Sequence, residues 1–158
     1  MTRALGPVAR RVSRVPGRLY DWHLGWLLGH RFLRLTHVGR RSGRRYRTVL
    51  EVVGPGPRPG EVVVMAGFGH AADWFRNIQA LPPVEVAIGL ERFRPEARVL
   101  GEQEAAAVLA GYERRNRLLA PVVRRVLSWL VGWQYDGSAA ARDRLVEQLP
   151  LVAFRRAD

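Results

Sequence analysis

The sequence has no cysteine and no lysine, and it lacks the usual catalytic motifs. The absence of cysteine excludes disulfides, thiolate zinc sites, iron–sulfur clusters and a cysteine nucleophile. The four histidines are scattered through the N-terminal half without an HExxH pair, and there is no Gly-x-Ser-x-Gly elbow. The carboxylates of residues 51–91 sit singly rather than in pairs. We therefore expect no metal site and no hydrolase machinery.

Long apolar runs are also missing. The longest stretches without a formal charge are residues 62–72 and 126–135. Both are far shorter than the roughly 18 to 20 apolar residues that cross a bilayer. Arginines at positions 10, 11, 14 and 18 interrupt every candidate signal sequence. The sequence therefore predicts a cytoplasmic protein without a membrane span.

The composition is that of a globular chain with an uneven charge. The 158 residues are 47% hydrophobic and 25% charged, which predicts one folded domain. All 26 basic residues are arginine. Residues 1–50 hold 12 arginines and one acid, Asp21, a net charge of +11, whereas residues 51–158 carry +1. This asymmetry points to an anionic partner: a nucleic acid, an anionic lipid or a phosphorylated small molecule.

Residues 1–30 form a basic, amphipathic segment in which we expect two helical stretches. The first has apolar residues at helical spacing over residues 5–19, and Pro16 breaks or kinks it. The stripe of the second consists of Leu19, Trp22, His23, Trp26, Leu27 and His30. Tryptophan and arginine together suit an anionic membrane surface, although apolar helical faces more often pack on the rest of a domain.

Residues 31–158 read as one domain of short strands followed by helices. We expect strands at 34–38, 46–53, 62–66, 84–88, 93–100 and 151–155. Asp73 would cap a short helix over residues 73–80, and three further helices would start near Glu102, Leu118 and Ser138. Six strands with few helices between them predict a small, mainly antiparallel barrel with helices outside it.

The strongest local signal is the predicted hairpin at residues 37–48, HVGRRSGRRYRT. Its two glycines, Gly39 and Gly43, allow positive φ angles, so that backbone N–H groups can converge on an anion. Arg41 and Arg47 could grip a phosphate through two hydrogen bonds each. A phosphate-binding turn and a merely solvated basic turn both fit this pattern.

The second signal is a glycine-spaced loop that leads into the short helix. The run AGFGH at residues 66–70 follows a buried-looking strand and permits close approach of the backbone to a flat ring. Trp74 would offer a stacking surface and Asn77 a two-way hydrogen-bonding group, unless Trp74 simply belongs to the core.

The order of GRRSGRRYRT, AGFG, DWFRNI, PPVEVAIG and RFRPEARVL resembles the deazaflavin-dependent nitroreductase family. The resemblance runs from about residue 34 to residue 100 and continues less distinctly to residue 154. It implies a six-stranded split antiparallel β-barrel of the FMN-binding, flavin-reductase type with flanking helices. It also implies coenzyme F-420, an 8-hydroxy-5-deazaflavin derivative. The positions that match the family's cofactor-binding residues are Arg41, Ser42, Gly43, Arg47, Thr48, Gly67, Phe68, Gly69, Trp74 and Asn77.

The activity implied by this resemblance is hydride transfer to an electron-poor acceptor such as a nitroaromatic, an enone or a quinone. The accompanying proton would come from water or from a hydroxyl such as that of Tyr135. One alternative is a barrel that binds FMN or only carries a cofactor. Another is a module that binds an anionic membrane or nucleic acid, of which nucleic acid is disfavoured because aromatic residues do not alternate with the arginines. Relatives with such barrels are often homodimers, and the sequence leaves the oligomeric state open.

Overall fold

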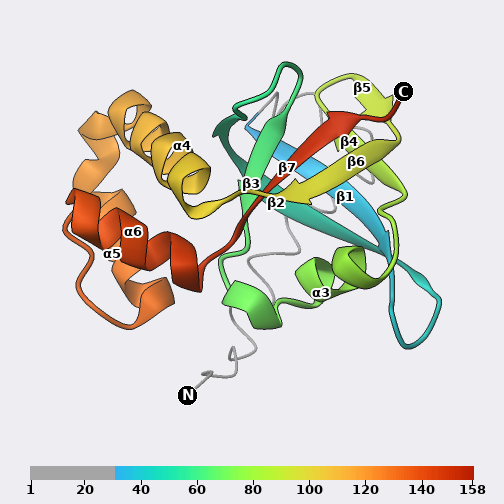
Figure 1. The fold of residues 1–158 in the computed structure, drawn as a ribbon, viewed down its shortest axis with the longest axis horizontal. Helices are drawn as coiled ribbons and strands as arrows, with labels where there is room; N and C mark the ends of the chain where they lie inside the picture. The colour runs from blue at the N-terminus through green and yellow to red at the C-terminus, as the bar shows by residue number, and fades with distance from the viewer. Residues whose placement is uncertain (1–30) are drawn as a thin grey trace.

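The computed structural model describes residues 31–158, and its centre is a seven-stranded antiparallel sheet that curls into a nearly closed barrel (Figure 1). The strands follow the order β5-β4-β1-β2-β3-β7-β6. Their bounds are Phe32–Val38 (β1), Arg45–Pro55 (β2), Val62–Met65 (β3), Glu85–Ile88 (β4), Glu91–Phe93 (β5), Pro95–Val99 (β6) and Leu151–Arg156 (β7). Because the two edge strands, β5 and β6, are consecutive in the chain, the sheet returns on itself there. The predicted split barrel is confirmed.

The barrel has seven strands rather than six because a short strand, β5, precedes the expected strand 93–100, which begins only at Pro95 as β6. β5 pairs with β4, whereas β6 pairs with β7 on the other side of the barrel. Proline has no N–H for a ladder hydrogen bond and restricts the residue before it. The break at Arg94, directly before Pro95, therefore lets one continuous segment pass from one edge of the sheet to the other.

Every second side chain of β1 points into the barrel and helps to fill its interior. Leu33 and Leu35 are fully buried and pack with residues of β2, β3, β4 and β7 in the interior cluster. The short helix α3, Asp73–Ala80, lies across one end of the barrel and contributes Trp74 and Phe75 to this cluster (Figure 1). Its bounds match the prediction. The expected cap was wrong, because the N-cap is Ala72 and Asp73 lies in the first turn.

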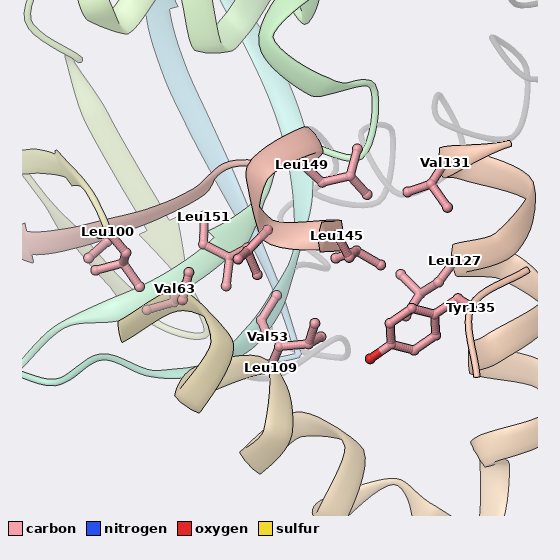
Figure 2. Packing of buried hydrophobic residues seen from close by; sticks show 13 residues of the cluster. Val53, Val63, Leu100, Leu109, Leu127, Val131, Tyr135, Leu145, Leu149 and Leu151 are labelled. Atoms are coloured by element: carbon pink, nitrogen blue, oxygen red, sulfur yellow. The ribbon is translucent and has the colours of Figure 1, made fainter. Parts of the chain in front are cut away.

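Three more helices cover the outside of the sheet next to β2, β3 and β7. They are α4 (Glu102–Arg115), α5 (Ala120–Val131) and α6 (Ala139–Gln148). Figure 2 shows the second core cluster, in which Leu109, Leu127 and Leu145 of these helices meet strand residues such as Val63 and Leu151. The predicted start of α6 is confirmed, because Ser138 Oγ accepts a hydrogen bond from the N–H of Ala141 at 3.1 Å.

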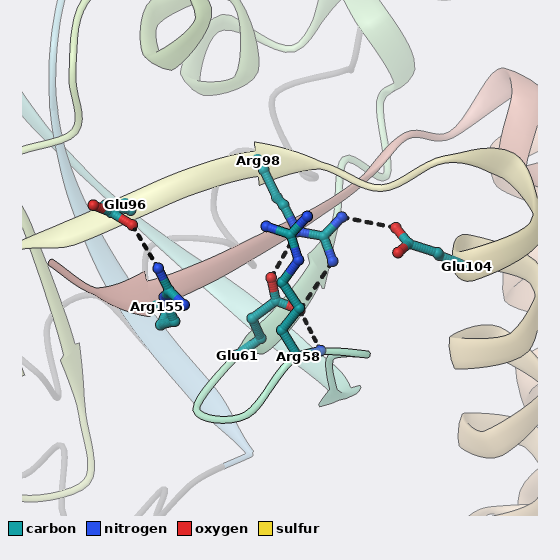
Figure 3. Close-up of polar contacts among 6 residues, drawn as sticks. All are labelled: Arg58, Glu61, Glu96, Arg98, Glu104 and Arg155. Atoms are coloured by element: carbon teal, nitrogen blue, oxygen red, sulfur yellow. Dashed lines mark hydrogen bonds and ion pairs between the residues drawn. The ribbon is translucent and has the colours of Figure 1, made fainter.

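Ion pairs of Arg98 connect β6 to neighbouring parts of the fold. The carboxylate of Glu61 accepts hydrogen bonds from Arg98 Nε at 2.7 Å and Nη2 at 3.1 Å, and from the N–H of Arg58 at 3.0 Å (Figure 3). Arg98 also donates to Glu104 at 2.7 Å, which links β6 to the first turn of α4. The hydrogen bond from Arg98 lowers the pKa of Glu61, so this carboxylate stays ionised although its side chain is only 3% exposed.

The predicted amphipathic segment, residues 1–30, lies outside the described residues, and so does the membrane contact expected of it. Within residues 31–158, none of the helices has the length and apolar character needed to cross a bilayer.

Candidate cofactor site

The hairpin between β1 and β2 has the tight turn that its glycines predict, although each glycine is needed for a different reason. Gly43 has a φ of 69°, a conformation that favours glycine. Gly39 leaves room for two side chains that pack over it, because a Cβ there would lie 2.6 Å from Ser42 Oγ and 2.7 Å from the ring of Tyr46 and would displace them. The expectation of positive φ is therefore confirmed at Gly43 and wrong at Gly39.

The backbone amides of the turn are largely used within the protein. The N–H groups of Gly39 and Gly43 bond to carbonyls across the turn, at 2.8 and 2.9 Å. The N–H of Arg44 donates to Ser42 Oγ at 3.2 Å, and that of Arg40 donates to Asn77 Oδ1 at 3.1 Å. These four amides therefore cannot converge on an anion as the sequence suggested. An anion at this turn would be held mainly by side chains.

A buried polar network joins the hairpin to α3. Asn77 Oδ1 accepts from Arg40 Nη1 at 2.8 Å as well as from the Arg40 N–H. Asn77 Nδ2 lies 3.1 Å from His37 Nδ1, and His37 Nε2 lies 3.1 Å from Thr48 Oγ1. Arg40 further forms an ion pair with Asp73 at 3.2 Å. Two predicted site residues, Thr48 and Asn77, are thus connected through His37.

The hydrogen bonds of Asn77 fix the protonation of His37. Because Asn77 Oδ1 is held by two donors of Arg40, its Nδ2 must be the group that faces His37 Nδ1. Nδ1 then accepts, and Nε2 carries the proton and donates to Thr48. Burial lowers the pKa of His37, and the nearby charge of Asp73 opposes this only in part. The network therefore requires a neutral histidine.

Positive charge is concentrated at the exposed part of the hairpin. The side chains of Arg41, Arg44 and Arg45 are exposed, and no carboxylate of the described residues forms an ion pair with any of them. Ser42 Oγ lies beside them, 3.1 Å from Tyr46 Oη. These unpaired guanidinium groups fit an anionic ligand, because each presents several N–H donors that match phosphate oxygens.

Arg47 and Thr48 point to opposite faces of β2. Thr48 is paired with the interior residue Leu35, whereas Arg47 is paired with Thr36, whose side chain lies on the outer face. On that face Arg47, Arg45, Thr36 and Glu85 line a cavity of about 460 Å³, together with Tyr46 and Val84. The structure therefore divides the residues that the sequence grouped into one phosphate site.

The loop after β3 brings the second group of predicted residues to the neighbouring end of the barrel. Gly69 has a φ of 74°, and a Cβ there would lie 3.1 Å from the carbonyl oxygen of Gln148. Phe68 is 52% exposed, so its ring is available to a ligand. Trp74 is 7% exposed and packs edge-on against Phe75. Trp74 is therefore a core residue with only a small exposed edge. This agrees with the alternative interpretation of the sequence, in which Trp74 belongs to the core instead of offering a stacking surface.

Tyr135 lies apart from these residues, in the helical layer of the molecule (Figure 2). It is 2% exposed, and its hydroxyl donates a hydrogen bond to Glu113. Burial and this hydrogen bond raise the pKa of Tyr135 above its ordinary value. The structure does not bring Tyr135 together with the hairpin and the loop.

Sequence reasoning missed His37, Arg40 and Asp73. The one available signal was the hairpin register: a turn centred on residues 40–43 places His37 opposite Tyr46 and next to Thr48. Contact with α3 could not be read in this way, because Asn77 is 40 residues away in the chain. Among residues 31–158 there is no cluster of three or more histidines and carboxylates that could hold a metal ion.

Comparison with known proteins gives one family match. The profile of the F420H(2)-dependent quinone reductase family matches residues 18–121, about two thirds of the chain. A search of curated proteins found no significant match.

Solved structures with a similar fold share little sequence with this chain. The protein Atu2129 of unknown function from Agrobacterium tumefaciens is 15% identical with a TM-score of 0.50, over 88% of this chain and 55% of that one. An F420-H2 dependent reductase, FDR-A, is 18% identical with a TM-score of 0.44, over 80% of this chain and 96% of that one. HutZ, the heme storage protein from Vibrio cholerae, is 12% identical with a TM-score of 0.48, over 89% and 91%. The match to Atu2129 supports the fold and nothing further.

Proposed function

Because the chain belongs to the F420H(2)-dependent quinone reductase family, we propose that it reduces a small, electron-poor acceptor of the quinone type with the reduced deazaflavin coenzyme. The chain is thus a deazaflavin-dependent reductase, and the acceptor is the part that we propose. Nitroaromatics and enones are further acceptors to test, because they accept a hydride at an electron-poor centre in the same way. When bound, the coenzyme supplies the hydride, and a proton from water completes the two-electron reduction.

The observation that supports a coenzyme site at this end of the barrel is the exposed group of unpaired arginines on a hairpin that is itself held rigidly. Arg41, beside Ser42 and Gly43, would bind the anionic end of the coenzyme. Arg40 cannot do so equally well, since Asp73 and Asn77 already occupy its guanidinium. The two adjacent arginines therefore have different roles: Arg40 fixes the hairpin, and Arg41 would bind the ligand.

The loop at residues 67–69 would border the ring of the coenzyme. Phe68 offers an exposed aromatic surface there, and the two glycines fix the loop that carries it, because Gly69 has a positive φ and lies against the carbonyl of Gln148 while Gly67 lies against Leu130. Thr48, Trp74 and Asn77 would act indirectly, because they hold the hairpin and α3 in fixed positions. A fixed hairpin lowers the entropy lost on binding and orients the ring toward the acceptor.

The coenzyme site is tested by a fluorescence titration of the full chain with the deazaflavin coenzyme and, in parallel, with FMN, and the acceptor by whether a quinone, and not buffer alone, oxidises the reduced coenzyme in the presence of the protein. We expect saturable binding of the deazaflavin and much weaker binding of FMN. Binding of FMN alone would favour the alternative of an FMN protein, and binding of neither would refute both.

A charged hydrogen bond contributes roughly 1.5 to 3 kcal/mol, so Arg41→Ala should weaken coenzyme binding by about 10- to 150-fold. Arg92→Ala, which removes an exposed arginine from β5, is the matched control and should leave the affinity unchanged. Arg47→Ala tests whether the outer face of β2 takes part in binding. A loss of coenzyme affinity as large as that of Arg41→Ala would mean that the anionic tail of the coenzyme reaches the outer cavity. Unchanged affinity in both Arg41→Ala and Arg47→Ala would show that the hairpin does not bind the coenzyme.

A further inference from the structure

Helix α5 carries one continuous apolar arc, and only one edge of this arc is buried. Leu127 and Val131 belong to the helical core cluster and point toward α6 (Figure 2). The other edge is exposed, and the short 3₁₀ helix Arg117–Leu119 directly before α5 extends it. We call this exposed surface the α5 face, and it consists of Leu118, Leu119, Val122, Val126 and Trp129. Because Leu118 is 93% exposed and Trp129 is 64% exposed, the α5 face is the kind of apolar surface that binds a partner.

The charge around the α5 face has a single sign. Residues 114–133, which run from the end of α4 through α5, contain five arginines and no acidic residue. Arg117 and Arg125 are exposed, and Arg125 lies one helical turn before Trp129. Within the part of the chain that the structure describes, neither of these two arginines forms an ion pair with a carboxylate. Their guanidinium groups are therefore available to an anionic partner.

The α5 face has its shape before any partner binds. Pro121 lies in the first turn of α5, where its fixed φ suits a helix and its missing N–H is not needed. Gly132 ends the helix with a φ of 79°, in the left-handed region that favours glycine. The buried side chains of Leu127 and Val131 attach the helix to the domain. Binding at the α5 face therefore does not cost the entropy of folding a helix.

We propose that the α5 face binds the surface of a bilayer that contains anionic lipids. A basic amphipathic helix of this kind lies in the plane of the interface, with its apolar side chains among the acyl chains and its arginines at the head groups. Trp129 suits this depth because its ring is apolar and its indole N–H is polar. Arg117 and Arg125 donate to lipid phosphates, while the apolar parts of their side chains lie along the bilayer.

A second copy of the chain fits the α5 face less well than a bilayer does. A symmetric dimer formed through α5 places the same surface on both sides of the contact. The arginines of residues 114–133 would then face those of the partner copy, and their like charges would oppose association. An anionic bilayer complements both the apolar side chains and the positive charge.

The test is binding of the full chain to vesicles without any coenzyme, so that its outcome is independent of the proposed reaction. Co-sedimentation should show binding to mixed vesicles of phosphatidylglycerol and phosphatidylcholine, with release at high salt and about tenfold weaker binding to phosphatidylcholine alone. Leu118→Glu should lower the affinity for the mixed vesicles by about tenfold or more, because it removes an inserted apolar side chain and adds a negative charge.

Leu90→Glu is the matched control for this substitution. Leu90 is 89% exposed and lies between β4 and β5, so the change of charge and the exposure are alike while the location differs. Its effect on vesicle binding should stay below about threefold, because it only adds to the long-range repulsion. A thermal melt checks that both variants are folded. Failure of the wild type to bind the mixed vesicles, or equal losses in the two variants, would overturn the proposal.

A fluorescent label locates the contact on the chain. Because the sequence has no cysteine, Val122→Cys and Leu90→Cys each provide a single site for an environment-sensitive dye. On the mixed vesicles, the emission of the label at position 122 should shift to shorter wavelength as the dye enters an apolar environment, whereas the emission at position 90 should not change. An unchanged emission at position 122 in the bound chain would overturn the proposal. A wild-type dimer that Leu118→Glu converts to a monomer in sedimentation equilibrium without lipid would overturn it in favour of a second copy.

Discussion

Replacing Asn77 tests whether the contact between the hairpin and α3 holds the candidate site together. Asn77 is 4% exposed, and its side chain makes three hydrogen bonds, two to Arg40 and one to His37. Neutral bonds contribute roughly 1 kcal/mol each and a bond to a charged group roughly 1.5 to 3 kcal/mol. Asn77→Ala removes all three and leaves the buried nitrogen of His37 without its donor. We expect the free energy of unfolding to fall by about 3.5 to 5 kcal/mol.

The assay is equilibrium unfolding in urea, supported by thermal melting. For a chain of this size the expected loss corresponds to a drop in Tm of roughly 7 to 20 °C. Gln79→Ala is the matched control, because Gln79 lies on the same helix and is exposed; its effect should stay within about 0.5 kcal/mol. Similar losses in the two variants would refute the view that Asn77 anchors the hairpin.

A second substitution at the same position separates the two halves of the network. Asn77→Asp keeps oxygen acceptors for Arg40 and removes the donor that faces His37 Nδ1. The new carboxylate favours a protonated His37, so this variant should gain stability relative to the wild type as the pH is lowered from about 7 to 5. Stability curves that run parallel over this range would contradict the assignment of the neutral histidine.

The remaining predictions concern buried charge and pH. Glu61→Gln removes a carboxylate buried against Arg98, so the free energy of unfolding measured in urea should fall by roughly 3 to 5 kcal/mol. Glu96→Gln, which breaks an exposed ion pair, is the control and should cost at most about 1 kcal/mol. Equal effects of the two substitutions would show that the Glu61 pair is solvated. Burial lowers the pKa of His37 in the folded chain, so between that value and about 6.5 the unfolded chain binds more protons and the stability of the wild type should rise with pH. His37→Gln should flatten this slope in urea titrations at several pH values, and an unchanged slope would assign it to other groups.

Much of the local structure could be predicted from the sequence, because it depends on neighbouring residues. The hairpin turn follows from the two glycines, and the start of α6 follows from Ser138, which caps the first turn. The bounds of α3 follow from its helical pattern and the prolines after it. The antiparallel barrel itself follows from short strands with few helices between them.

Tertiary structure alone decided which of these pieces meet. Arg47 and Thr48 are neighbours in one strand, so alternation alone puts them on opposite faces, but the closure of the barrel decided that Thr48 faces the interior and Arg47 the outer cavity. Asn77 reaches His37 only because α3 lies across the end of the barrel, 40 residues away along the chain. Tyr135 is held in the helical layer by its bond to Glu113. Spacing in the sequence encodes periodicity and turns, whereas these contacts depend on how separate elements pack in space.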